Sequence, residues 1–181
     1  MGRCDHEQKC GYHFTPRDYF EQNPSEKEKF AENSFRSYAP IKEAKPIATS
    51  YIDLDIVNLS LQRYPDNKLF QFLSAQFGEA ETLKLMGKYK IGTSKHWDGA
   101  TVFWQTDNQN KVRTGKIMLY NSETGKRIKE PYNHVTWVHS VLHKGDYNLK
   151  QCFFGEHLLP EDKSRPVALV ESEKTTLIAS Y

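Results

Sequence analysis

The segments Ala100-Thr-Val-Phe-Trp-Gln105 and Val112-Arg-Thr-Gly-Lys-Ile-Met-Leu-Tyr120 decide the fold of this chain. Both are rich in β-branched and aromatic residues, which favour strands. The four residues Asp107-Asn-Gln-Asn110 lie between them and have the composition of a tight turn. Two strand-forming runs joined by a turn are typical of a β-hairpin, so we expect a hairpin over residues 100–120.

Three helices are expected before this hairpin, because apolar residues recur there at helical spacing. An Asp near position 55 caps the first helix, and Pro65 ends it. Gly78 closes the second helix in the manner of a C-terminal glycine. The expected ranges are about 55–64, 67–77 and 80–86.

Short strands and a final helix are expected after the hairpin. A turn at Ser122-Glu-Thr-Gly125 leads to strands around residues 134–138 and 152–154. Pro166 then introduces the apolar run Val167-Ala-Leu-Val170, which we interpret as a strand, and residues 171–180 continue from it as a helix. Helices, antiparallel hairpins and then the first β-α unit predict an α+β fold.

Changes in composition divide the chain into four parts. A small module with closely spaced Cys and His residues ends at Thr15-Pro16. The following stretch is rich in Glu, Lys, Asn, Ser and Pro, and its prolines prevent any long helix from crossing it, so we interpret it as a linker. The expected parts are the module 1–20, the linker 21–50, an α+β subdomain 51–165 and the start of a further domain at 166–181.

Composition excludes several classes of protein. No apolar run approaches the roughly 20 residues of a membrane-spanning helix, and the polar start of the chain is unlike a signal peptide. Three cysteines do not make a disulfide framework, and Cys152, beside two Phe residues, is interpreted as a core residue. We therefore expect a cytoplasmic protein with no membrane partner.

The charge is unevenly distributed. The whole chain has a net charge of +2, but residues 84–129 hold ten Lys or Arg against three acidic residues, which leaves −5 for the rest. A locally basic region is one mark of a nucleic-acid-binding protein. The alternative is that the basic residues form an ordinary solvated face of the hairpin.

The N-terminal module holds four candidate metal ligands: Cys4, His6, Cys10 and His13. Thiolate and imidazole ligands suit tetrahedral zinc. Their spacing is not a standard one, so a second interpretation is the latter half of a zinc ribbon whose first Cys-x-x-Cys pair lies outside this sequence. A third is a frayed tail with two free thiols.

Glu171 follows the apolar run 167–170 and precedes the final helix. In open α/β sheets ligands bind beyond the carboxyl ends of the strands, where a carboxylate can reach a divalent cation. A helix cap or a solvated charge is the alternative interpretation of the same position.

The run Val170-Glu-Ser-Glu-Lys-Thr175 resembles the opening motif of the TOPRIM domain of DNA primases, with Ser172 and Thr175 where the phage and plasmid variants have Gly and Asp. The resemblance implies that Glu171 is the acidic residue of that domain, a metal ligand or general acid/base, with Lys174 close by. Magnesium or manganese would serve that centre. TOPRIM chemistry also needs a later Asp-x-Asp pair, so we expect no primer synthesis by the chain as given.

Upstream, Tyr89–Trp104, Val112–Asn121 and Thr124–Ile128 are similar to the N-terminal subdomain of bacterial primases, whose basic surface contacts single-stranded template. That resemblance implies phosphate contacts by Lys95, Arg113, Lys116, Lys126 and Arg127. His96, Trp97 and Trp104 would stack on bases, although a Trp in a strand is usually part of the core.

Primases of this class also carry an N-terminal zinc ribbon, and Cys10-Gly-Tyr-His-Phe-Thr-Pro16 is similar to a primase-like family of bacterial mobile elements. The order of these features predicts a primase-like, replication-associated protein that binds single-stranded DNA and has an incomplete nucleotidyl-transfer centre. Replication proteins are possible partners. The alternative is a non-enzymatic nucleic-acid-binding or adaptor protein of a mobile element.

Overall fold

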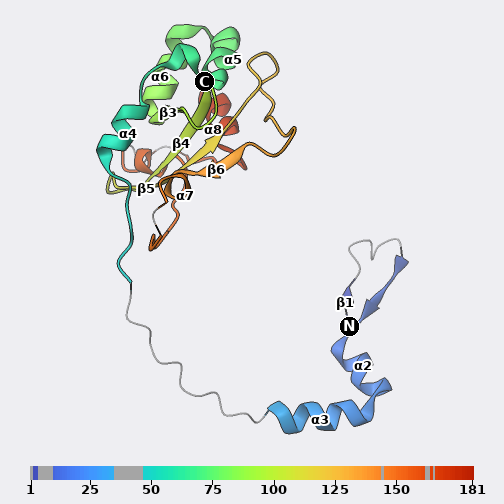
Figure 1. The fold of residues 1–181 in the computed structure, drawn as a ribbon. Helices are drawn as coiled ribbons and strands as arrows, with labels where there is room; N and C mark the ends of the chain where they lie inside the picture. The colour runs from blue at the N-terminus through green and yellow to red at the C-terminus, as the bar shows by residue number, and fades with distance from the viewer. Residues whose placement is uncertain (1, 4–9, 35–46, 144, 162–163, 165) are drawn as a thin grey trace. The chain divides into compact units, whose positions relative to one another are not determined.

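The computed structural model describes residues 2–3, 10–34, 47–143, 145–161, 164 and 166–181 (Figure 1). Contacts divide the chain into two compact units, Met1–Pro46 and Ile47–Tyr181. Each unit is described below by itself. In the described part of the chain, every helix is too short or too polar to cross a membrane.

The first unit begins with a two-stranded antiparallel ladder, in which β1 (Gly2–Arg3) pairs with β2 (His13–Phe14). Helix α2 (Pro16–Gln22) follows, with Thr15 and Asp18 forming a reciprocal capping box. Helix α3 (Pro24–Ser34) then occupies part of the stretch expected to be a linker. The expectation missed α3 because Pro24 stands at its first residue, where a helix tolerates proline.

The second unit is an α+β domain, as expected. Its sheet is antiparallel throughout, in the order β3-β4-β5-β6. Its elements are α4 (Leu54–Ser60), a 3-10 turn (Tyr64–Asp66), α5 (Lys68–Phe77), α6 (Glu79–Lys88), β3 (Ile91–Ser94), β4 (Ala100–Thr106), β5 (Val112–Met118), β6 (Val135–Trp137), α7 (Val138–Val141), a second 3-10 turn (Glu156–Leu158) and α8 (Glu173–Ala179).

The predicted hairpin is strands β4 and β5, and a buried carboxylate shapes its turn. Asp107 accepts hydrogen bonds from the backbone N–H groups of Gln109 and Lys111, both at 2.9 Å, and from Nε of Arg113 at 2.8 Å. Burial alone would raise the pKa of Asp107, but these three donors hold the pKa below its ordinary value. The turn therefore keeps an ionised carboxylate almost fully enclosed.

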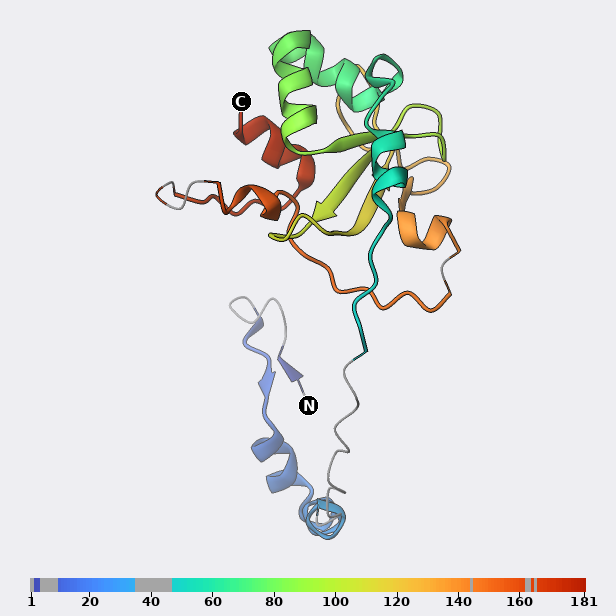
Figure 2. The same cartoon turned by 90° about the vertical axis from the view of Figure 1, so that its left-hand side faces the viewer.

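Helices cover both faces of this sheet, which explains why β4 is nearly continuously buried. Phe103 packs in one cluster with residues of α5, α6 and α8, whereas Val102 and Trp104 pack in a second cluster with residues of α4 and α7. Adjacent strand residues face opposite sides, so the two clusters lie on opposite faces of the sheet. Figure 2 shows α5, α6 and α8 on one side of the strands and α4 and α7 on the other.

The predicted strand at 167–170 is wrong. The structure has no strand between residues 166 and 171, and Val167 and Leu169 are 73% and 81% exposed. An apolar run becomes a strand only where a neighbour pairs with it, and no described strand lies beside this one. The helix expected after it is α8, whose Leu177 is fully buried against α5 and α6 residues, so 166–181 belongs to the same compact unit as the sheet.

Three smaller differences concern element boundaries. Helix α4 ends at Ser60, before Pro65, and β3 was not expected. Residues 152–154 form no strand; Phe154 instead packs against Tyr89 and Phe103. Cys152 is partly buried there, and burial raises the pKa of its thiol to about 12, so it stays protonated and unreactive at neutral pH.

Candidate nucleic-acid interface

Four rings stack edge to face and face to face at one end of the sheet, and we call them the aromatic ladder: His96, Trp97, His134 and Tyr132. The ring centroids of His96 and Trp97 are 4.5 Å apart, those of Trp97 and His134 are 5.1 Å apart, and those of His134 and Tyr132 are 4.3 Å apart. His96 is exposed and Tyr132 is 53% exposed. The ladder therefore offers aromatic surface to solvent.

Local backbone contacts hold the first half of the ladder in place. The hydroxyl of Ser94, at the end of β3, accepts a hydrogen bond from the backbone N–H of His96, and Trp97 O accepts one from Ala100 N. Gly99 has a φ of +72°, and a Cβ there would lie 2.5 Å from the backbone oxygen of Asp66. Only glycine fits this close turn, which returns the chain into β4 directly after Trp97.

The second half of the ladder comes from the long connection between β5 and β6. The backbone of His134 bonds to Ile128 on one side and to Leu119 on the other, which fixes the ring beside Trp97. His134 is 9% exposed, and its Nδ1 is buried with no hydrogen-bond partner in the described part of the chain.

Exposed cations lie on the same two segments. Lys95 directly precedes the ladder, and Lys126, Arg127 and Lys129 lie on the connection that carries Tyr132. Within the described residues, none of these four side chains forms an ion pair. Of the residues expected to bind nucleic acid, the structure therefore brings Lys95, His96 and Trp97 together and leaves Lys126 and Arg127 exposed on a neighbouring loop.

The other two expected cations are already neutralised within the protein. Arg113 pairs with Asp107 at 2.8 Å and lies over the ring of Tyr51, while Lys116 pairs with Glu173 at 3.1 Å and lies over the ring of Trp137. Their side chains are only 20% and 25% exposed. We therefore leave Arg113 and Lys116 out of the candidate interface.

Trp104 is not accessible for stacking on bases either. It is buried in the core on β4, and its indole N–H donates a hydrogen bond of 2.9 Å to Oγ of Ser60. Gly115, opposite on β5, leaves room for the ring, because a Cβ there would lie 2.7 Å from the indole. Trp104 is a core residue, the alternative that its position in a strand suggested.

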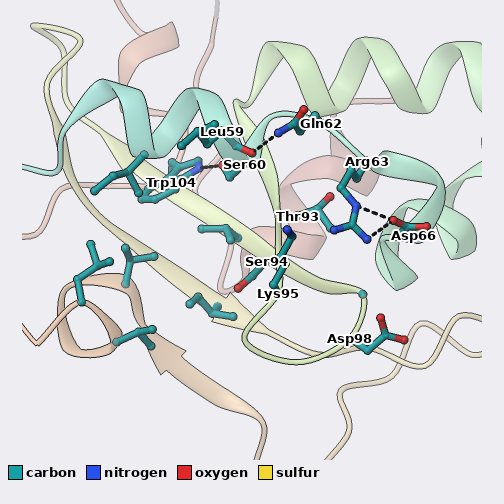
Figure 3. A pocket seen from close by; sticks show the side chains of 17 residues that line it. Leu59, Ser60, Gln62, Arg63, Asp66, Thr93, Ser94, Lys95, Asp98 and Trp104 are labelled. Atoms are coloured by element: carbon teal, nitrogen blue, oxygen red, sulfur yellow. Dashed lines mark hydrogen bonds and ion pairs between the residues drawn. The ribbon is translucent and has the colours of Figure 1, made fainter.

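A cleft of about 780 Å³ opens between α4 and α7, over the sheet face that carries Trp104 (Figure 3). Lys95 lines one end of the cleft, and the next residue in the sequence, His96, is the first ring of the aromatic ladder. Sequence reasoning missed this cleft, as it missed Tyr132 and His134. No spacing in the sequence indicates that the rings of residues 97 and 134 come into contact, or that helices α4 and α7 flank one cleft.

Glu171 and Lys174 do not converge on one centre. Glu171 is exposed just before Ser172, the N-cap of α8, and it lines a shallow hollow with Glu156 and Glu173. Glu156 accepts the backbone N–H of Phe153, and Glu173 pairs with Lys116. Lys174 donates to the backbone oxygen of Gly125 at 2.8 Å. Among the residues that the structure describes, no three His, Cys, Asp or Glu side chains are grouped as metal ligands.

The N-terminal candidates are only partly visible. Cys4 and His6 lie outside the described residues. Cys10 is exposed, and His13 is the first residue of β2, where it pairs with Arg3 of β1. The β1–β2 ladder therefore brings the two ends of the Cys- and His-containing segment together.

Comparisons with known proteins agree with this two-part organisation. Residues 1–25 match the model of a zinc beta-ribbon finger, and residues 67–181 match a model described as a domain of unknown function, DUF6371. No curated protein and no solved structure matches the chain. The primase and TOPRIM resemblance is not among these findings and stays a prediction. Because the second model covers more than half of the sequence, the protein belongs to the DUF6371 family.

Proposed function

We propose that the unit Ile47–Tyr181 binds single-stranded nucleic acid, with the aromatic ladder and Lys95 as its contact surface. The observation that carries the proposal is a set of stacked rings that remains partly open to solvent beside Lys95, a cation that forms no ion pair with the described residues. Single-strand-binding proteins combine these two features, because every base has a face that can stack and every nucleotide has a phosphate.

A purely structural role explains the ladder less well. Rings that serve the core are buried, as Trp104 and Phe103 are in this protein. Tyr132 and His96 are instead turned to solvent, although they contact the partly buried rings of the ladder. Lys126, Arg127 and Lys129 extend the positive charge along the connection that carries Tyr132, where a phosphate backbone would find further contacts.

The test is an anisotropy titration of a labelled oligothymidylate with the wild-type chain and with Trp97→Ala/Tyr132→Ala. Because base stacking contributes about 1–3 kcal/mol per base, the double variant should bind at least about tenfold more weakly. Phe153→Ala is the matched control, since Phe153 is an exposed aromatic residue outside the ladder. The single variant Tyr132→Ala, at the exposed end of the ladder, serves as a second test in case the double variant does not fold, and circular dichroism reports whether each variant is folded. Equal affinity of wild type and folded ladder variants would refute the proposal.

Binding, rather than catalysis, is the function that the described residues support. The primase resemblance extends the proposal to DNA replication and to metal-dependent nucleotidyl transfer through Glu171 and Lys174, with magnesium or manganese. The exposed position of Glu171 and the bond of Lys174 to Gly125 give that extension no geometric support. A non-enzymatic binding or adaptor protein is accordingly the form of the proposal that we favour.

We further propose that the N-terminal module binds zinc through Cys4, His6, Cys10 and His13. The match to a zinc beta-ribbon finger and the pairing of β1 with β2 support it, since thiolates and imidazoles are ligands that zinc prefers. Purified protein should contain about one zinc ion per chain, as measured by inductively coupled plasma mass spectrometry. Chelation should lower the protease resistance of residues 1–25 while the second unit melts unchanged; a zinc-free protein with the same resistance would contradict the proposal.

A further inference from the structure

We infer that the cleft between α4 and α7 binds one nucleotide, with the base between its apolar walls and the phosphate at the Lys95 end. This inference rests on the proposed function in one respect, because it takes the ladder as the surface that brings a nucleic acid strand to the cleft. It adds a second, recessed site of different chemistry to the open stacking surface.

The walls and floor of the cleft are apolar and incompletely covered. Helix α4 contributes Ile56 and Leu59, α7 and the residue after it contribute Val141 and Leu142, and the floor includes Trp104. Leu59 is 71% exposed, so the cleft leaves large apolar surface in contact with water. A flat hydrophobic ligand would remove that surface from water, which is the main source of affinity in small-molecule sites.

The floor is rigid. The indole of Trp104 is fixed by its hydrogen bond to Ser60, which in turn donates to the backbone oxygen of Val57. A Cβ on Gly92 would lie 2.2 Å from Oγ of Ser60 and 3.1 Å from Nε1 of Trp104. The glycine in β3 therefore permits the contact between α4 and the sheet that shapes the floor.

One end of the cleft is polar and favours an anion. Thr93, Ser94, Arg63 and Lys95 line it, and Figure 3 shows the ends of Arg63 and Lys95 directed into the same part of the cleft. Arg63 is held by Asp66, with nitrogen–oxygen distances of 2.6 and 2.8 Å, so that its charge is balanced. Lys95 forms no hydrogen bond or ion pair with any residue that the structure describes, which leaves one cation to meet a ligand.

Asp98 also lines this end and would repel an anion placed near it. In Figure 3 its carboxylate lies apart from Lys95, across the loop that joins β3 to β4, and the two form no ion pair. An anionic group is therefore favoured on the Lys95 side and excluded on the Asp98 side. Such asymmetry orients a ligand that has one flat apolar end and one charged end.

A nucleotide fits these demands better than a fatty acid does. The volume falls within the range of about 300–1,000 Å³ that is usual for small-molecule sites. The amide nitrogen of Gln62 donates to the backbone oxygen of Leu59, and its side-chain oxygen can accept a hydrogen bond from the edge of a base. Lys95 is followed at once by His96, the first ring of the ladder. A strand stacked on the ladder would thus pass the mouth of the cleft, where one unstacked base could enter. The nucleotide can come from such a strand or from free solution.

The experiment titrates the full chain with deoxyadenosine monophosphate and follows the Trp104 indole N–H signal by two-dimensional NMR. Saturable movement of that signal is expected, with weaker binding of deoxyadenosine, which lacks the phosphate. Lys95→Ala should weaken binding of the monophosphate about tenfold by removing its charged hydrogen bond. Val141→Trp should abolish binding by filling the cleft, whereas Leu169→Trp, an equal addition at an exposed site, should leave it unchanged.

A parallel anisotropy titration with oligothymidylate separates this inference from the proposed function. If oligothymidylate bound but the monophosphate did not move the Trp104 signal, the inference about the cleft would be overturned and the proposal about the aromatic ladder would stand. Monophosphate binding that Val141→Trp removes, without strand binding, would support the cleft as a site for free nucleotides and overturn the ladder. Displacement of the signal by palmitate but not by the monophosphate would also overturn the inference.

Discussion

Strand β5 and the loop after β3 both carry basic residues, but they use them in opposite ways. In β5, Arg113 and Lys116 meet carboxylates of the same chain and lie over aromatic rings. In the loop, Lys95 has no carboxylate partner among the described residues and precedes rings that remain open to solvent. The first set stabilises the fold, and the second is available to a partner.

The comparison teaches that a local excess of basic residues does not identify a binding surface. A mostly buried cation that is paired with a carboxylate of the same chain has its charge neutralised and out of reach of a phosphate. An exposed cation without such a partner can still attract one. The distinction follows from which residues the fold brings together. It also predicts that substitutions in the two regions affect different properties of the protein.

The largest expected effect is on stability, from Arg113→Ala. This change leaves the almost fully buried Asp107 without its charged partner, which should lower the free energy of unfolding by about 3 kcal/mol. Lys95→Ala should change it by less than about 0.5 kcal/mol, as is usual at an exposed site. Urea denaturation measures both values. If the two variants were equally stable, the division between structural and available cations would fail.

A smaller effect concerns pH. The folded pKa of Asp107 lies below its ordinary value, so its contribution to stability is fully present above that ordinary value, about 4, and is lost as the pH falls through the folded pKa. Arg113→Ala raises the folded pKa toward the unfolded one and should therefore make the stability less dependent on pH in this acidic range. Urea denaturation of wild type and variant at pH 3, 4 and 5 tests this. If the free energy of unfolding fell by the same amount with pH in both proteins, the Asp107–Arg113 pair would not be the cause of the pH dependence.

The smallest expected effect is on nucleic-acid affinity, from single lysines. Lys95→Ala should weaken binding of single-stranded DNA about threefold to fivefold at low salt. It should also reduce the steepness of the plot of log binding constant against log salt concentration by about 0.7. Lys116→Ala should leave both quantities unchanged, because Glu173 already neutralises Lys116. Anisotropy titrations at three salt concentrations measure the slopes. A larger loss from Lys116→Ala than from Lys95→Ala would reverse the comparison.

Much of the fold could be predicted because its signals are local. The turn at Asp107 and the cap and closing glycine of α5 are encoded within a few residues of the elements that they shape. Asn67 shows the limit of such signals: it caps α5 at the place where the helix was expected to begin, but it also bonds Gly92 and Thr101 across the domain. The strand expected at 167–170 was wrong because strand formation depends on a pairing neighbour that no local pattern reveals.

The candidate site was predictable only in its first half. Lys95, His96 and Trp97 are consecutive and stand out by composition, whereas His134 and Tyr132 join them only through the pairing of β5 with β6. The same reasoning selected Arg113 and Lys116 for their charge, because their partners Asp107 and Glu173 become neighbours only in the folded chain. Long-range contacts decided both outcomes.

The most direct test of the central claim is photo-crosslinking of the chain to a single-stranded oligonucleotide that contains 5-iodouracil, followed by mass spectrometry of the crosslinked peptides. Iodouracil reacts with aromatic rings on which it is stacked, so the account predicts crosslinks at Trp97 and Tyr132, and their loss at high salt. Crosslinks confined to β5 or to residues 166–181, with none at the aromatic ladder, would contradict it.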